Sequence, residues 1–288
     1  MNEQAPLILL VGMHRSGTSL LGSLLPQLGV PLPGELIDAD QHNPEGYYER
    51  RDITDLQEQL LIDLGHWWPS QQGVLPLPAD WLNHPATRAC KASLRQLLRQ
   101  EQQQQRSAWA IKDPRTSLLL PLWCELSEEL ALPLKLVLSV RDPREVMVSL
   151  QQRDQQAAGM TAWRAQQLWW RHHIQLLADA ASLPLHVLHY SRWFSEPAAQ
   201  LQQLTKVCGG QASPEAMAAA LALIKPQHRR SHSRIKRWPP IHPQLRRFER
   251  RLLQLSNHPE QRHSIEQWAA HQPSVISLPF SHLRHCQR

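Results

Sequence analysis

The chain has 288 residues, of which 42% are hydrophobic, so it has the length and apolar content of one α/β domain, and disorder over its whole length is excluded. Its net charge of +6 favours an anionic partner: a small ligand, a nucleic acid or a lipid surface. The four cysteines include no CxxC pair, so we expect neither a disulfide framework nor a zinc site.

The first expected element is a buried strand over Leu7–Val11, followed by the loop GMHRSGTS at 12–19 and by helical spacing at 20–28. This is the context of a phosphate-binding loop, where backbone N–H groups and a helix dipole attract an anion. The loop nearly matches the pattern G-x-x-x-x-G-K-[ST]. However, Thr18 replaces the lysine of that pattern, and Arg15 places a cation inside the loop instead.

The missing lysine changes the expected ligand. In P-loop kinases the lysine reaches the β- and γ-phosphates, and an Asp at a strand end helps to hold magnesium. Here the lysine is absent and no hydrophobic strand ends in a lone Asp. A ligand with one phosphate and one further anionic group, neutralised by Arg15 and backbone N–H groups without metal, fits better. A simple glycine turn with Arg15 exposed to water is the alternative.

The second and third expected strands both end in a cation. The sequence AWAIKDPRTS places Lys112 after the strand Trp109–Ile111, and LKLVLSVRDPREVMVSL ends the strand Leu134–Val140 at Arg141. The carboxyl ends of parallel strands meet at one edge of a sheet, where ligands bind. Together with the cation of the first loop, they predict a site for a multiply anionic ligand. Surface cations at the starts of loops are the alternative.

The segment after the third strand has the features of a helix start. Asp142 can cap the helix, Pro143 suits its first position, and Glu145 completes a pair like that of a capping box. Ser149 lies two turns into this helix, beyond its N-terminal N–H groups. From its position alone, we expect Ser149 to be solvated.

A fourth strand, Leu185–His189, completes an alternation of strands, turns and helical patterns. This predicts an α/β fold, a three-layer sandwich with a central parallel sheet and a helical C-terminal segment. We expect a single domain over residues 1–288, with a core at about 6–235 and an extension at about 240–288. Further helical periodicity is expected at 52–64, 88–105, 196–208, 213–224, 243–255 and 259–271, with a proline-rich loop at 69–85.

Neither end of the core carries a targeting or nucleic-acid signature. The start MNEQAP lacks the basic residues of a signal peptide, and the apolar run after it is too short to span a bilayer, so we expect a cytoplasmic protein without a membrane span. The basic run KPQHRRSHSRIKRW at 225–238 contains one aromatic residue and matches no nucleic-acid-binding module. A nucleic-acid partner is therefore not expected, and the oligomeric state is left open.

The first loop resembles the loop [PH]-[KR]-S-G-T-[ST] of sulfotransferases that use 3′-phosphoadenosine 5′-phosphosulfate (PAPS). Arg141 with Ser149 eight residues later resembles the pair that holds the 3′-phosphate in that family. KDPRTS at 112–117 resembles the Lys-Asp-Pro element of its bacterial and tyrosylprotein branches. HNPEGYYER at 42–50 is similar to a segment of bacterial members, and the resemblance covers about residues 6–235. The loop residues are His14, Arg15, Ser16, Gly17, Thr18 and Ser19.

The resemblance implies a P-loop-like sulfotransferase fold and a role for each of these segments. The first loop would hold the 5′-phosphosulfate of PAPS, and Arg141 and Ser149 would hold its 3′-phosphate. A late basic loop closes over the 3′-phosphate in this fold, and Arg229 and Arg230 would serve there. The enzyme would transfer a sulfuryl group to a hydroxyl or amine without a metal.

The base is the point where the sequence departs from the family. Cytosolic members use the His of a K-T-H element, where this chain has Pro114, while other branches use a Glu. Glu49, which matches the N-P-x-G segment, is the first candidate base; Glu35 is the second and Glu45 the third. For each of them a solvated surface charge is the alternative, and His14 and His42 are further residues on the acceptor side.

Sulfuryl transfer needs a base, charge neutralisation and in-line geometry. Arg15 suits the neutralisation of the sulfuryl oxygens, and Lys112 suits the bridging oxygen where leaving-group charge develops. Trp67-Trp68 and Tyr47-Tyr48 could line a pocket for a small-molecule or carbohydrate acceptor. The rival functions are a P-loop nucleotide kinase that uses ATP and magnesium, and a non-catalytic protein that binds nucleotides or nucleic acid.

Overall fold

A four-stranded parallel sheet lies at the centre of the computed structural model, which describes residues 4–105, 107–180, 183–229 and 240–276. The strand order is β2-β1-β3-β4. The strands are β1 (Leu7–Val11), β2 (Trp109–Lys112), β3 (Leu134–Val140) and β4 (Leu185–His189). All four predicted strands are confirmed, and β2 extends one residue further than predicted, so that Lys112 is its last residue.

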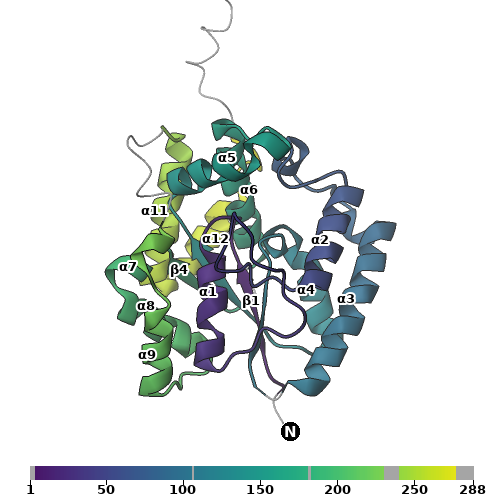
Figure 1. Cartoon of the computed structure of the whole chain (residues 1–288). Helices are drawn as coiled ribbons and strands as arrows, with labels where there is room; N and C mark the ends of the chain where they lie inside the picture. Colours follow the sequence, from purple (N-terminus) through teal and green to yellow (C-terminus); the bar gives the residue numbers. More distant parts are fainter. Residues whose placement is uncertain (1–3, 106, 181–182, 230–239, 277–288) are drawn as a thin grey trace, which may run out of the picture.

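Helices cover both faces of the sheet, which confirms the predicted three-layer α/β sandwich. Figure 1 shows α1 and α7–α9 on one side of the molecule and α2–α4 on the other. The α-helices are α1 (Thr18–Leu24), α2 (Arg51–Asp63), α3 (Pro85–Gln104), α4 (Thr116–Leu130), α5 (Pro143–Ala158), α6 (Ala162–Asp179), α7 (Arg192–Ser195), α8 (Pro197–Val207), α9 (Pro214–Ala222), α11 (Pro243–Asn257) and α12 (Arg262–Ala270). Short 3₁₀ turns lie at Pro26–Leu28, Gln72–Val74, Trp81–Asn83, Pro226–His228 and Pro259–Gln261.

The side chains of β1 alternate between two apolar clusters, because successive residues of a strand point to opposite faces of the sheet. Leu7, Leu9 and Val11 pack with α2–α6, α11 and α12, whereas Ile8 and Leu10 pack with α1, α8 and α9. All five side chains are fully buried. The apolar run that reads as a continuous strand is therefore covered on both faces, as a central parallel strand requires.

Prolines mark helix starts in this chain more precisely than periodicity does. The sequence pattern predicts Pro85 at the end of the proline-rich loop, but it is the first residue of α3, three residues before the predicted helix start. Proline suits this position because its missing N–H and fixed φ cost nothing in the first turn. Pro143 opens α5 in the predicted way, with the Asp142 side chain accepting a bond from the backbone N–H of Arg144.

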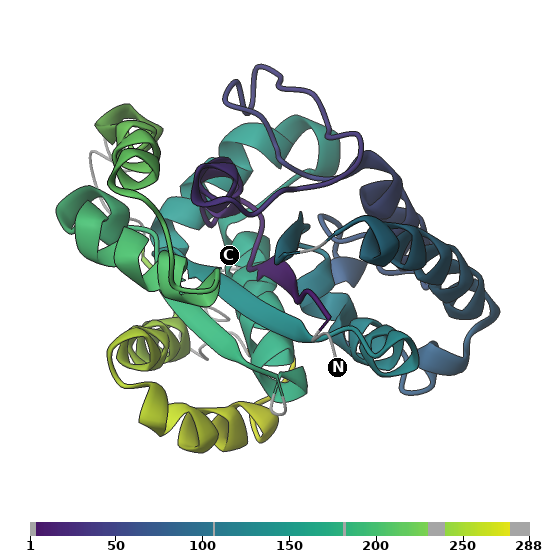
Figure 2. The same cartoon turned by 90° about the horizontal axis from the view of Figure 1, so that it is seen from below.

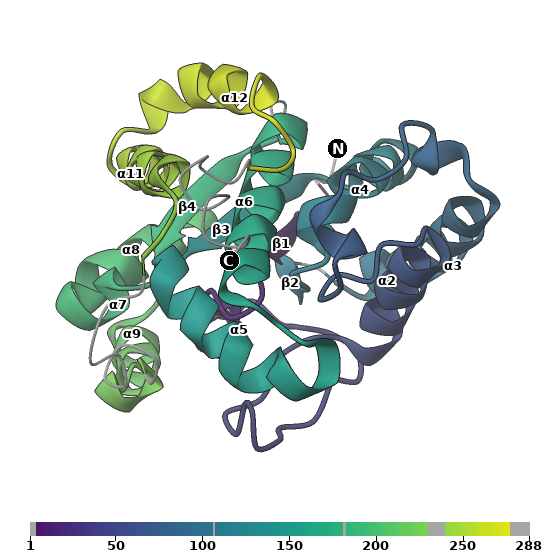
Figure 3. The same ribbon diagram turned by 90° about the horizontal axis from the view of Figure 1, so that it is seen from above.

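The C-terminal helices pack on the body of the fold. Leu245 and Phe248 of α11 and Ile265 of α12 belong to the same apolar cluster as one face of β1. Figures 2 and 3 show α11 and α12 (yellow) beside β4 and α6. This packing supports the proposal of a single domain. In the part of the chain that the structure describes, no helix has the length and apolarity needed to cross a membrane.

The strand order brings three of the predicted site segments together. β1 lies between β2 and β3, with Leu10 level with Lys112 and Val11 level with Leu138. The glycine-rich loop after β1 therefore emerges between the ends of β2 and β3. These are the strands that carry Lys112 and lead to Arg141.

Candidate active site

A cavity of about 500 Å³ opens at the carboxyl edge of the sheet. This is within the range of small-molecule sites. It is lined by predicted donor-site residues from the first loop and from two strand ends, and by aromatic residues from two loops. These lining residues include His14, Arg15, Gly17, Thr18, Ser19, Glu49, Lys112 and Arg141, together with Tyr47, Tyr48, Trp67 and Trp68. The structure thus brings together residues that are up to about half of the chain apart.

Neighbouring elements hold the glycine-rich loop through its backbone. The donors and acceptors come from α4, from β3 and from the end of β3. Ser117 Oγ accepts from Gly12 N at 2.9 Å and donates to Gly12 O at 3.2 Å. Ser139 Oγ donates to Ser16 O at 2.8 Å. Arg141 Nη1 donates to Arg15 O at 3.0 Å. The loop conformation is therefore fixed by residues far away in the sequence.

These bonds have a consequence for the N–H groups of the loop. The carbonyl oxygens of Ser16 and Gly17 accept bonds from Ser139 Oγ and from the backbone N–H of Leu20. The C=O and N–H of a planar trans peptide point in opposite directions. The N–H groups of Gly17 and Thr18, two residues that line the cavity, are consequently directed away from the donors Ser139 Oγ and Leu20 N–H. Such a row of N–H groups is suited to binding an anion.

Gly17 is the glycine that this loop requires most. Its φ is 91°, and a Cβ at this position would lie 2.1 Å from the Tyr190 ring. A side chain would therefore meet both backbone strain and a clash with a buried ring.

Replacing Gly17 by alanine is expected to lower the free energy of unfolding by about 2–5 kcal/mol, of which about 1–2 come from the left-handed backbone and about 1–3 from overpacking. Urea unfolding measures the change. Gly29→Ala is the matched control, because Gly29 also has a positive φ, 76°, but a Cβ added there would have no described atom within 4 Å. Equal losses in the two variants would contradict a role for the Tyr190 contact.

Arg15 lies between the predicted 5′- and 3′-sides of the donor site. Its Nε donates to Ser149 Oγ at 2.8 Å, and its Nη1 donates to the carbonyl oxygen of His42 at 3.3 Å. Burial lowers the pKa of Arg15 to about 10, and repulsion from Arg153 and Arg141 adds to this effect. Arg15 is still cationic at neutral pH, so an anion bound here would relieve the repulsion among three guanidinium groups.

Ser149 is buried rather than solvated, in contrast to the expectation from its position alone. It is 4% exposed, because α5 turns this face toward the glycine-rich loop. Its hydroxyl accepts from Arg15 Nε, so the helix α5 and the first loop meet at this residue.

Arg141 is buried, and one nitrogen of its guanidinium group has no hydrogen-bond partner among the described residues. Its Nε donates to Glu145 at 2.8 Å, its Nη1 bonds the first loop, and its guanidinium lies 4.4 Å from the centre of the Tyr190 ring. Its Nη2 has no hydrogen-bond partner among the described residues, and the same holds for Ser16 Oγ and His14 Nε2. Buried polar atoms in proteins are rarely left unpaired. Three of the unpaired atoms belong to predicted donor-binding residues, so a polar ligand bound there would supply their partners.

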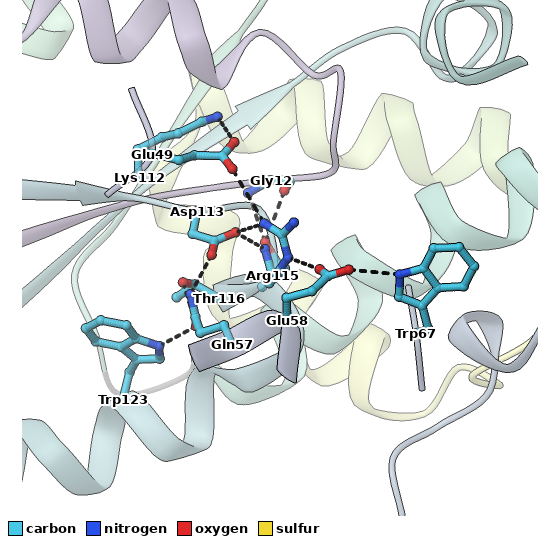
Figure 4. Close-up of polar contacts among 11 residues, drawn as sticks. Gly12, Glu49, Gln57, Glu58, Trp67, Lys112, Asp113, Arg115, Thr116 and Trp123 are labelled. Carbon is cyan, nitrogen blue, oxygen red and sulfur yellow. Dashed lines mark hydrogen bonds and ion pairs between the residues drawn. The ribbon is translucent and has the colours of Figure 1, made fainter. Parts of the chain in front are cut away.

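Glu49 and Lys112 form a buried ion pair in the same cavity (Figure 4). Lys112 Nζ donates to Glu49 Oε1, and their side chains are 2% and 7% exposed. Arg115 Nη1 lies 3.5 Å from the second carboxylate oxygen of Glu49. The leading candidate base and the candidate bridging-oxygen ligand are thus in direct contact.

Arg115 is a candidate site residue that the sequence reasoning missed. It lies in the cavity wall and bonds Glu58 and Asp113, and Glu58 in turn accepts from Trp67 Nε1 at 2.8 Å (Figure 4). These carboxylates raise its pKa against the opposing effect of burial. The signal was present, since Arg115 follows Lys112 by three residues at the same strand end.

The other predicted residues are placed as follows. Glu35 is 78% exposed and bonds Arg51 at 2.9 Å, and it is not among the residues that line the cavity. Glu45 lies in the cavity wall.

Arg229 bonds Glu145, whereas Arg230 lies outside the described residues. Ser19 Oγ accepts from Asn43 Nδ2 at 3.1 Å, which ties the segment 42–50 to the first loop.

Aromatic rings form one wall of the cavity. His14 stacks on Trp68 with ring centres 3.8 Å apart, and Arg153 lies 5.2 Å from the centre of the Trp68 ring. Burial, with repulsion from Arg115 and Arg153, holds the pKa of His14 well below its usual value, so its imidazole is neutral at pH 7. Arg153 was also missed, although it follows Ser149 by one helical turn.

The sequence profile of the Sulfotransferase family matches residues 6–214. The chain belongs to this family. The resemblance that the first loop, Arg141 and Ser149 indicated is confirmed, and the chain is an enzyme of the sulfotransferase type. No curated protein matches the chain in sequence.

Solved sulfotransferase structures are similar to this sulfotransferase at low sequence identity. A sulfotransferase domain from the curacin biosynthetic pathway is 18% identical with a TM-score of 0.51, over 86% of this chain and 98% of that domain. The sulfotransferase domain of the Synechococcus PCC 7002 olefin synthase is 20% identical with a TM-score of 0.44, over 97% and 98%. STF9 from Mycobacterium avium is 16% identical with a TM-score of 0.43, over 95% and 78%. The first of these likenesses shows a shared fold.

Proposed function

We propose that this sulfotransferase moves a sulfuryl group from PAPS to the hydroxyl or amine of a small-molecule or carbohydrate acceptor. The observation that supports this most is the unpaired, buried Nη2 of Arg141, beside a loop whose N–H groups and Arg15 suit a second anionic group. The ligand that fits has two separated anionic groups. A cytoplasmic location and independence of metal are parts of the same proposal.

The residues divide into two groups according to the part of the donor that they would bind. The first loop and Arg15 would hold the 5′-phosphosulfate. Arg141, Ser149 and Arg229 would hold the 3′-phosphate, and Arg230 is proposed for the same role from the resemblance alone. The donor supplies the sulfuryl group, and the leaving group is adenosine 3′,5′-bisphosphate.

The reaction forms a bond from the acceptor oxygen or nitrogen to sulfur as the bond from sulfur to the bridging oxygen breaks. Lys112 would neutralise the charge that develops on the bridging oxygen. Glu49 would take the acceptor proton. Because the Glu49 carboxylate accepts a hydrogen bond from Lys112 Nζ, this one contact would orient both side chains. Glu45, in the cavity wall, is the next candidate base, and Glu35 is the weakest, because its exposed carboxylate lies outside the cavity lining.

Ligand-induced stabilisation tests the donor class. Adenosine 3′,5′-bisphosphate at about 100 times its dissociation constant is expected to raise the free energy of unfolding by about 2.7 kcal/mol, since it would bind only the folded chain. Thermal unfolding with this nucleotide, with ATP and magnesium, and with a DNA oligomer measures the effect. Stabilisation by ATP and magnesium alone would support a kinase, and stabilisation by DNA alone would support a nucleic-acid-binding protein. Either result would overturn the proposal.

A further inference from the structure

One buried carboxylate bonds two of the guanidinium groups at this site. Glu145, in the first turn of α5, is 1% exposed. Its Oε2 accepts from Arg141 Nε at 2.8 Å, and its Oε1 accepts from Arg229 Nε and Nη2 at 3.1 and 2.6 Å. Glu145 therefore connects the end of β3 to the start of the late basic segment.

The two arginines differ in how firmly the rest of the protein holds them. Arg141 is also fixed by its bond to the first loop and by the Tyr190 ring. The side chain of Arg229 is 25% exposed. Of its five N–H groups, one on Nε and one on Nη2 donate to the same carboxylate oxygen of Glu145. An arginine released from such a contact gains rotamer freedom, which it must lose again when it binds a ligand.

We propose that Glu145 is a positioning residue that holds Arg229 beside Arg141, so that the two arginines receive one phosphate group. This sets a preference for a nucleotide with a 3′-phosphate over one with a 3′-hydroxyl. The inference rests on the proposed function, because it takes Arg141 to be the 3′-phosphate ligand.

The charges and directions at this site are consistent with such a receptor. Two guanidinium groups and one carboxylate leave a net positive charge for the incoming phosphate. Glu145 accepts from Nε of Arg141 and the first loop accepts from Nη1, whereas Nη2 has no partner among the described residues. The bond that holds Arg141 therefore leaves this donor available. Charge-assisted bonds from a fixed guanidinium fork to phosphate are among the stronger polar contacts in proteins.

The test compares the dissociation constants of adenosine 3′,5′-bisphosphate and adenosine 5′-monophosphate by calorimetry. Glu145→Gln is expected to weaken binding of the bisphosphate about tenfold and of the monophosphate less than about twofold, since only the bisphosphate has the group that Arg229 receives. Glu266→Gln is the matched control, because Glu266 is also buried and bonds the arginine four residues earlier, Arg262. It is expected to leave the ratio of the two constants unchanged.

A second variant shows whether Glu145 acts through Arg229. Arg229→Ala is expected to give the same selective loss, and the double variant with Glu145→Gln is expected to lose little more, as for residues that act as one unit. If Glu145→Gln does not fold, Glu145→Asp takes its place, because it keeps the charge but shortens the reach to Arg229. The shortened variant is also expected to lose the bisphosphate preference.

The outcomes separate this inference from the proposed function. A wild-type protein that binds the two nucleotides equally would contradict the proposed 3′-phosphate site itself. A wild-type preference that survives in both Glu145 variants would overturn the inference and leave the proposed function standing. Tighter binding of the bisphosphate in a Glu145 variant would also overturn the inference, because Glu145 would then be an anion that competes with the phosphate. Equal losses of affinity for both nucleotides would overturn it as well.

Discussion

Replacing Lys112 by methionine is expected to lower the rate of sulfuryl transfer about 10²- to 10³-fold, the usual cost of removing one donor that stabilises developing charge. Binding of adenosine 3′,5′-bisphosphate should change far less, because the first loop and Arg15 would still hold its 5′-phosphate, whose oxygens share the charge. Methionine keeps most of the buried volume of the lysine side chain, and Glu49 keeps its contact with Arg115. The rate is measured as transfer of ³⁵S from labelled PAPS to the small-molecule fraction of a cell extract.

Lys91→Met is the matched control for this variant. Lys91 also pairs with carboxylates, Glu125 and Glu129, but it connects α3 to α4 outside the cavity lining. Its replacement is expected to leave the transfer rate unchanged. Equal losses of rate and of product affinity in Lys112→Met would mean that Lys112 only holds the donor.

Replacing Glu49 by glutamine is expected to lower the transfer rate about 10²- to 10⁴-fold, the range of general base catalysis. Glutamine has nearly the same shape and can still accept a bond from Lys112, so the geometry of the site should be retained. Adenosine 3′,5′-bisphosphate should still bind and stabilise the variant. The same labelled transfer assay measures the rate, with donor at saturating concentration.

Glu101→Gln controls for the loss of a buried charge. Glu101 is 8% exposed and bonds Arg50 at 2.5 Å, outside the cavity lining. Breaking a buried ion pair from one side costs about 3–5 kcal/mol of stability, so both variants should unfold more easily. Only Glu49→Gln should lose transfer activity. Full activity in that variant would make the Glu49–Lys112 pair structural, and Glu45, in the same cavity wall, would become the next candidate base.

The fold followed from short-range patterns. Each strand is an apolar run bounded by a turn. The ends of these strands can be predicted from the sequence, because a strand buried on both faces excludes polar residues. The strand order does not follow from such patterns, since it depends on how the helices pack between strands. The start of α3 at Pro85 was missed for a local reason: the same residue type ends loops and opens helices.

The candidate site was predictable where residues follow a strand, and much less so elsewhere. Arg15, Lys112 and Arg141 converge because parallel strands share an edge. The contact of Glu49 with Lys112 depends on the path of the segment 30–50, which has little periodicity. Glu35 and Glu49 both lie in this segment, and their different burial is set by tertiary packing.

The way in which the glycine-rich loop is held has a consequence for protein engineering. The loop has a short signature, and short signatures invite transplantation into other scaffolds. Here, however, its backbone is held by hydroxyl groups of Ser117 and Ser139 and by Arg141, each more than 100 residues away. We expect that an eight-residue graft of the loop would not reproduce this anion site. A graft that carries those three side chains in matching positions would be the smallest transferable unit.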